Sequence, residues 1–287
     1  MSAPLWPAPA KLNRFLHIAG RRADGYHLLQ TIFQFIDRCD FLDFTVRADG
    51  VIQRQGEVGG VPAEDDLCVR AARLLQDACS VRQGVTITID KRLPLGGGLG
   101  GGSSDAATTL VALNHYWKTD LSKAELADLG LKLGADVPVF VHGRAAWAEG
   151  VGERLMPLDS LDEPWFVVVV PACSIATGAV FGDPRLTRDS QPVTINDFVA
   201  GKVRNDCEAV VYRRYPPVAA AARWLQAYGQ ARLTGTGACV FAAFAERSAA
   251  EAVLARLPPS LPGFVARGLN RSPLWERLQC ELHGARV

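Results

Sequence analysis

The sequence predicts an α+β protein of two domains, residues 1–158 and 159–287. An alternating apolar segment, residues 85–90, is followed by a glycine-rich loop and then by a helix-like segment. A linker-like stretch, residues 157–164, precedes an apolar run at residues 166–170 that is typical of a buried strand. After that run, helix-like and strand-like segments alternate. This β-α-β-like order favours an α+β sandwich for the second half.

The first half is expected to begin with strands. Strands are predicted at residues 11–18, 29–37, 41–47 and 85–90, and helices after residue 66, at 106–117 and at 122–133. Asp65 or Asp66 is placed to cap the first of these helices, because apolar residues recur at helical spacing after them. Ser122 and Glu125 have the spacing of a capping box, which predicts where the third helix begins.

The second half is expected to continue with shorter elements. Helices are predicted at residues 206–214, 218–228 and 248–257, and strands at 166–170, 231–234, 239–244 and 264–267.

Composition excludes several classes of function. The net charge of the 287 residues is +1, which gives no general reason to expect nucleic acid or an anionic membrane as a partner. The apolar run at 165–172 is far shorter than the roughly 20 residues of a membrane span, and the first ten residues do not resemble a signal peptide. The seven cysteines form no C-x-x-C pair, so we expect reduced thiols in a cytoplasmic protein.

The glycine-rich loop is the strongest functional signal. Glycines allow the backbone to approach a ligand closely, and the unpaired N–H groups at the start of the next helix attract an anion, best a di- or triphosphate. The expected phosphate-binding residues are Pro94, Gly96, Gly97, Gly98, Gly100, Gly101, Gly102, Ser103 and Ser104. A flexible linker would not lie between a strand and an amphipathic helix.

Two familiar nucleotide loops fit this segment poorly. It lacks the lysine of the P-loop pattern G-x-x-x-x-G-K-[ST]. Gly96, Gly98 and Gly101 satisfy the dinucleotide pattern G-x-G-x-x-G, but a run of glycines satisfies it easily. A dinucleotide fold also needs an acidic residue at the end of the next strand, and Asp120 follows a helix instead.

Residues 94–106 resemble the phosphate loop of the GHMP kinases, and the triple glycine resembles that family's diphosphocytidyl-methylerythritol kinase branch. Four further segments agree in order along the chain: residues 8–13, 20–27, 134–140 and 233–241. The resemblance implies an N-terminal ATP-binding α/β domain, a C-terminal α+β domain and an active site in the cleft between them. It also implies transfer of the ATP γ-phosphoryl group to the 2-hydroxyl of a CDP-linked methylerythritol.

The resemblance assigns chemical roles to individual residues. Asp136, in a tight turn between Gly134 and Pro138, is the expected general base. Lys11 is the expected cation beside it, which would keep the carboxylate ionised and stabilise charge on the transferred group. Without the resemblance, Asp136 could equally cap a helix and Lys11 could lie on the surface.

The resemblance also implies an acceptor site. Tyr26 and His27 are expected to hold the cytosine, with Phe181 on its other face. Thr177 belongs to the same segment as Phe181, and Asn13 is expected near the attacked hydroxyl.

The adenine and metal sites are less distinct. Asp66 stands where the family carries an asparagine, and Lys91 precedes the glycine loop, so both are expected near the adenine or ribose. Magnesium is expected to accompany ATP, although the sequence contains no dedicated metal cluster. Ser104 or Asp105 is an open possibility as a ligand.

Two alternatives remain at this point. The chain could be another GHMP kinase, acting on homoserine or mevalonate, against which the clamp of Tyr26, His27 and Phe181 argues. It could also be a ligand sensor without catalysis, against which Lys11 and Asp136 argue.

Overall fold

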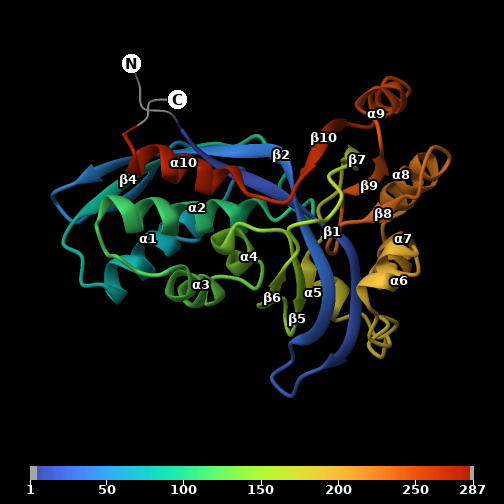
Figure 1. The fold of residues 1–287 in the computed structure, drawn as a ribbon, viewed down its shortest axis with the longest axis horizontal. Helices are drawn as coiled ribbons and strands as arrows, with labels where there is room; N and C mark the ends of the chain where they lie inside the picture. Colours follow the sequence, from blue (N-terminus) through green and yellow to red (C-terminus); the bar gives the residue numbers. More distant parts are fainter. Residues whose placement is uncertain (1–4, 285–287) are drawn as a thin grey trace.

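Two long antiparallel strands, β1 (Trp6–Arg21) and β2 (His27–Arg47), connect the two halves of the molecule (Figure 1). The structure is a computed structural model that describes residues 5–284. The sequence predicted two strands, 29–37 and 41–47, where the structure has the single strand β2. Asp40 lies between the two predicted segments and is fully buried. Its Oδ1 accepts the N–H groups of Arg92 and Leu93 at 2.6 and 2.7 Å, so the polar residue is satisfied without a turn.

The described strands join one mixed sheet. The others are β3 (Ile52–Gln55), β4 (Gly84–Asp90), β5 (Ala146–Glu149), β6 (Arg154–Pro157), β7 (Trp165–Val169), β8 (Arg232–Leu233), β9 (Val240–Phe244) and β10 (Gly263–Leu269). The order is β3-β4-β2-β10-β7-β9-β8, with β1 and β5 also paired to β2, and β6 to β5. The β3–β4 pair is parallel and the other pairs of strands are antiparallel. The sheet therefore runs through both halves of the chain.

Helices cover this sheet in two groups. The first group shares one hydrophobic core and consists of α1 (Leu67–Ala78), α2 (Gly101–Tyr116), α3 (Lys123–Leu131), α4 (Val137–His142) and α10 (Pro273–Leu282). The second half contains α5 (Thr177–Phe181), α6 (Ile195–Val199), α7 (Glu208–Arg214), α8 (Pro216–Gln226) and α9 (Arg247–Leu254). Figure 1 shows α10 beside α2, at the opposite end of the molecule from α8 and α9.

Most of the predicted elements are confirmed, within a few residues at their ends. Ser122 caps α3 and forms the predicted capping box with Glu125. Helix α2 begins at Gly101 rather than at residue 106, because the last glycines of the loop already belong to its first turn. The sequence did not predict β3, β5, β6, α4, α5, α6 or α10, most of which are too short to show a clear period.

The C-terminal helix bears on the domain organisation. Leu274 of α10 is fully buried and Trp275 packs beside it in the core formed by α1 to α4. The end of the chain thus contributes to the core of the N-terminal half. The boundary after residue 158 stays a prediction. Within residues 5–284, none of the helices combines the length and hydrophobicity that a membrane crossing requires.

Candidate active site

The glycine loop (residues 94–104) adopts a conformation that only glycine tolerates at several positions. Gly96, Gly98 and Gly100 have φ of 66°, 75° and 73°. A Cβ on Gly98 would lie 2.2 Å from the carbonyl oxygen of Thr234, and one on Gly100 would lie 2.9 Å from Cζ of Phe140. Glycine is therefore required both for the backbone angle and for the close approach of neighbouring segments.

The carbonyl groups of the loop are held by a second turn, the threonine turn (residues 234–239). The N–H groups of Ala238 and Cys239 donate to the carbonyl oxygens of Gly96 and Gly97 at 3.2 and 3.1 Å. The hydroxyl of Thr234 donates to the carbonyl oxygen of Gly98 at 3.1 Å. These bonds hold the glycine loop in place through its carbonyl oxygens.

The N–H groups of the same loop are left available. Among the described residues, the backbone N–H groups of residues 96–103 donate to no protein acceptor, whereas that of Ser104 already bonds to the carbonyl of Gly100 at 2.8 Å. Residues 101–103 form the first turn of α2, where N–H groups have no partner within the helix. The loop is thus a cradle of free donors at the positive end of a helix, which is suited to a phosphate chain.

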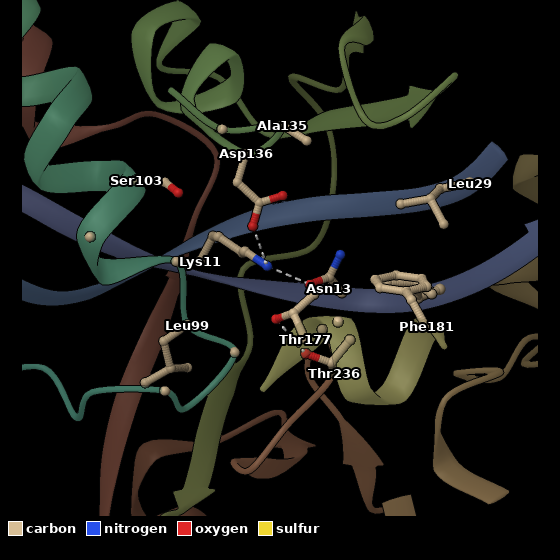
Figure 2. Close-up of a pocket in the computed structure, with 18 of the residues that line it drawn as sticks. Lys11, Asn13, Leu29, Leu99, Ser103, Ala135, Asp136, Thr177, Phe181 and Thr236 are labelled. Carbon is tan, nitrogen blue, oxygen red and sulfur yellow. Dashed lines mark hydrogen bonds and ion pairs between the residues drawn. The ribbon is translucent and has the colours of Figure 1, made fainter. Parts of the chain in front are cut away.

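Beside this cradle, Lys11 of β1 meets Asp136. Lys11 Nζ lies 3.1 Å from Asp136 Oδ2 and donates to Oδ1 of Asn13 at 2.6 Å (Figure 2). The Lys11 side chain is 3% exposed, while that of Asp136 is 34% exposed. Asp136 stands at the N-cap position of α4, but its side chain makes no capping hydrogen bond. Its carboxylate is therefore not occupied by its own helix and reaches the cleft.

A third group of residues lies on the far side of Asn13. The rings of His27 and Phe181 are stacked, with centroids 4.9 Å apart and planes inclined by 27°. Tyr26 is 61% exposed. The hydroxyls of Thr177 and Thr236 lie 3.1 Å apart and link α5 to the threonine turn. Figure 2 shows Thr177 and Phe181 on α5, facing the Lys11–Asn13 side of the cleft.

One cleft of about 860 Å³ connects these three groups. The predicted site residues that line it are Lys11, Asn13, Tyr26, His27, Lys91, Pro94, Gly96, Gly97, Gly98, Gly100, Gly101, Gly102, Ser103, Asp136, Thr177 and Phe181. The volume is large enough for a nucleotide and a second ligand together. Phosphoryl transfer to an alcohol requires phosphate-binding donors and a proton acceptor, which the free amides and the lysine–carboxylate pair can supply in this cleft. The aromatic residues beside them can hold the acceptor.

Comparison with known proteins agrees with this geometry. The family model of the GHMP kinases N terminal domain matches residues 66–144, and that of the GHMP kinases C terminal matches residues 197–261. A protein of Nitrosococcus oceani named 4-diphosphocytidyl-2-C-methyl-D-erythritol kinase is 59% identical over 275 residues, which are 96% of this chain and 98% of that protein. The chain belongs to the GHMP kinases, in this branch of the family.

Further relatives of this GHMP kinase carry the same name or share its fold. A protein of Halorhodospira halophila with that name is 58% identical over 272 residues, covering 94% of each chain. A crystal structure of 4-(cytidine 5'-diphospho)-2C-methyl-D-erythritol kinase has a TM-score of 0.77 at 32% identity and covers 92% of this chain and 99% of that one. A mevalonate kinase structure, at 16% identity and a TM-score of 0.66, covers 94% and 100% and shares the fold alone. These matches confirm the predicted fold class.

Two predicted ATP-site residues of the GHMP kinase are not among those that line the cleft. Asp66 is buried, accepts the N–H of Cys68 at 2.8 Å as the cap of α1, and pairs with Arg54 at 2.7 Å. Its carboxylate is thus already occupied, and its contact with adenine stays a prediction. Ser104 is fully buried in α2, and its hydroxyl has no hydrogen-bond partner among the described residues.

Lys91 lines the cleft within a charged cluster. Its Nζ lies 2.5 Å from Asp40 Oδ2 and 2.6 Å from Asp105 Oδ2. Burial alone would lower the pKa of Lys91, but Asp105 and Asp40 together raise it, so the ammonium stays charged. Burial raises the pKa of Asp105 to about 7, against the opposite effect of Lys91, while Asp40 raises it further. Lys91 is thus neutralised beneath the cradle rather than free to bind phosphate.

Sequence reasoning missed three residues that hold the site together. Thr31 of β2 accepts from Nδ2 of Asn13 at 3.0 Å and fixes its amide. Asn205 donates to the carbonyl oxygens of Leu233 and Gly235, both at 2.8 Å, and so shapes the threonine turn. Arg188 donates from Nε to Nε2 of His27 at 3.1 Å. None of the three stands in a recognisable motif, so no local signal could have found them.

Proposed function

We propose that this GHMP kinase transfers the γ-phosphoryl group of ATP to the 2-hydroxyl of 4-diphosphocytidyl-2-C-methyl-D-erythritol, in the non-mevalonate route to isoprenoid precursors. The observation that carries the proposal is the position of the Lys11–Asp136 pair. The pair lies between the free amides of the glycine loop and an acceptor wall formed by Tyr26, His27 and Phe181. The high identity to relatives named for this reaction supports the choice of acceptor.

The glycine loop supplies the binding site for the ATP phosphates. Amide donors of residues 96–103 meet the phosphate oxygens, and the start of α2 favours their negative charge. Because the loop is fixed by the threonine turn, its donors are preorganised and need not be rearranged when charge develops.

Asp136 and Lys11 carry out the transfer itself. A new bond forms between the acceptor oxygen and the γ-phosphorus while the bond to the β–γ bridging oxygen breaks, and Asp136 takes the hydroxyl proton. Lys11 lies 3.1 Å from Asp136, where its ammonium orients the carboxylate and stabilises charge on the transferred group. Asn13 accepts a hydrogen bond from Lys11 and donates one to Thr31, so it holds the Lys11 ammonium in position beside Asp136.

His27, Phe181 and Tyr26 form the acceptor wall. Stacking on an aromatic face is suited to any nucleobase, and an imidazole can select the polar edge of one. The exposed ring of Tyr26 is free to cover a base that lies against Phe181. A kinase for homoserine or mevalonate has no need of such a wall, since those acceptors contain no base.

Magnesium fits the site as a companion of ATP. Within residues 5–284 there is no cluster of three or more His, Cys, Asp or Glu side chains for a metal. The buried hydroxyl of Ser104, beside the cradle and without a hydrogen-bond partner there, is the group that would hold the ion. When bound, magnesium neutralises charge on the β- and γ-phosphate oxygens.

A coupled assay of ADP release tests the proposal. The purified protein is given ATP and magnesium with each of three acceptors: the CDP-linked methylerythritol, homoserine and mevalonate. We expect turnover with the first alone. Turnover with homoserine or mevalonate instead would identify another GHMP kinase, and no turnover with any of them would favour a sensor without catalysis.

A further inference from the structure

Arg188 contacts the acceptor wall through His27, and all three nitrogens of its guanidinium group donate hydrogen bonds. Its Nη2 donates to the carbonyl oxygens of Phe181 and Asp183, both at 2.8 Å, and its Nη1 donates to that of Leu186 at 3.0 Å. The remaining nitrogen, Nε, donates to Nε2 of His27 at 3.1 Å. A planar guanidinium held at three carbonyls has little freedom to turn, so the direction of its fourth bond is fixed.

This bond determines where His27 carries its proton. An arginine side chain only donates hydrogen bonds, so the Nε2 atom that faces Arg188 must present a lone pair. A neutral imidazole with a lone pair on Nε2 carries its proton on Nδ1. Burial lowers the pKa of His27, and the positive charges of Arg188 and Arg21 lower it further, so the ring stays neutral.

The Nδ1–H group is left for a ligand. In the hydrogen bonds of residues 5–284, Nδ1 of His27 has no partner, and the residue lines the cleft next to Phe181. Cytosine presents acceptors at N3 and O2, whereas uracil carries an N–H at N3. A fixed donor can therefore bond to N3 of cytosine, but it meets a second donor at N3 of uracil.

We propose that Arg188 is a specificity-positioning residue, which holds His27 as an Nδ1–H donor and so makes the acceptor site select cytosine over uracil. The inference rests on the proposed function, since it assumes a cytidine nucleotide in this wall. Arg188 acts through His27 and does not touch the reacting atoms. Its loss should change the choice of base while leaving the Lys11–Asp136 pair intact.

Two measurements test this role. Long-range ¹H–¹⁵N spectra of the histidine rings report which nitrogen of His27 is protonated. The kcat/KM ratio between the cytidine substrate and its uridine analogue reports selectivity. Arg188→Met removes the charge and the bond, and Arg188→Lys keeps the charge but cannot bond to three carbonyls and His27 at once. Arg213→Met is the matched control, because Arg213 contacts the same loop through Asp183 at 3.3 Å without contacting His27.

We expect the Nδ1–H form in the wild type and in Arg213→Met, and a substantial Nε2–H form in both Arg188 variants. The selectivity ratio should fall about tenfold in the Arg188 variants, mainly through the acceptor KM, because one directed hydrogen bond is lost. A wild-type His27 protonated on Nε2 overturns the proposal without any variant. An unchanged selectivity ratio in Arg188→Met also overturns it. Failure of the proposed function would appear separately, as a wild type that does not use the cytidine substrate although its His27 tautomer is still measurable.

Discussion

Lys11 Nζ and Asp136 Oδ2 lie 3.1 Å apart, although one residue belongs to the first strand and the other stands at the start of α4. The lysine is almost fully buried and is held by Asn13, while the carboxylate is one-third exposed to the cleft. A carboxylate that is paired, open to the cleft and free of its own helix is placed to accept a proton from a bound alcohol.

Asp136→Asn should abolish this base while keeping its shape. We expect kcat to fall by about a hundredfold or more, as for loss of a general base. ATP affinity should change little, since the cradle is untouched. Single-turnover kinetics and titration with a fluorescent ATP analogue give the two quantities. A variant with wild-type kcat would show that another group takes the proton.

His27→Ala should act on the acceptor rather than on ATP. The substitution removes the ring stacked on Phe181 and, with it, the polar edge that we propose binds the base. We expect the acceptor KM to rise by about tenfold or more, with the KM for ATP within about twofold of the wild type. Initial-rate kinetics with each substrate varied in turn measure the change. An unaltered acceptor KM would remove His27 from the binding site.

Gly98→Ala should destabilise the protein by more than the strain of the positive φ angle alone, because the added Cβ overlaps a neighbouring carbonyl group. Gly98 and Gly60 have nearly the same φ, 75° and 74°, but a Cβ on Gly98 would lie 2.2 Å from the carbonyl oxygen of Thr234, whereas one on Gly60 meets nothing within 4 Å. Both variants carry left-handed strain of about 1 kcal/mol, and Gly98→Ala should lose at least about 1 kcal/mol more. Urea unfolding measures the difference, and ATP affinity should fall in Gly98→Ala alone. Equal losses in the two variants would contradict the close docking of the threonine turn.

Asp105 should make stability depend on pH. Burial raises the pKa of Asp105 to about 7 in the folded protein, while in the unfolded chain it is about 4. Between these values the folded state holds one more proton, so this group's contribution to the free energy of unfolding falls as pH rises from about 4 to 7 and is level above 7.

Asp105→Asn isolates this effect. The free energy of unfolding of the wild type minus that of the variant should fall as pH rises towards 7, by up to about 1.4 kcal/mol per pH unit. Urea unfolding between pH 5 and 8 measures it. Glu125→Gln is the control, because Glu125 is exposed and its pKa is lowered by the Ser122 side chain, so its contribution is lost as pH falls. If the free energy of unfolding of the wild type minus that of Asp105→Asn rose with pH instead, the raised pKa of Asp105 would be contradicted.

Local patterns in the sequence determined most of the regular structure and the nature of the cradle. Glycines between a strand and a helix can be read directly, because φ restrictions and free helix-terminal N–H groups act within a few residues. Ser122 and Glu125 fixed the start of α3 for the same reason. The motif resemblance added roles for Lys11 and Asp136, whose proximity it implied but could not measure.

Only the tertiary structure decided which distant residues meet. Burial of Asp40 beside two backbone N–H groups let β2 continue where two strands were expected. Pairing with Arg54 occupied the carboxylate of Asp66, and donors of the threonine turn fixed the carbonyl groups of the glycine loop. Arg188 reached His27 from a segment without any motif. Such contacts depend on which surfaces are buried together and which buried polar groups must then be satisfied, and neither is encoded in the spacing of nearby residues.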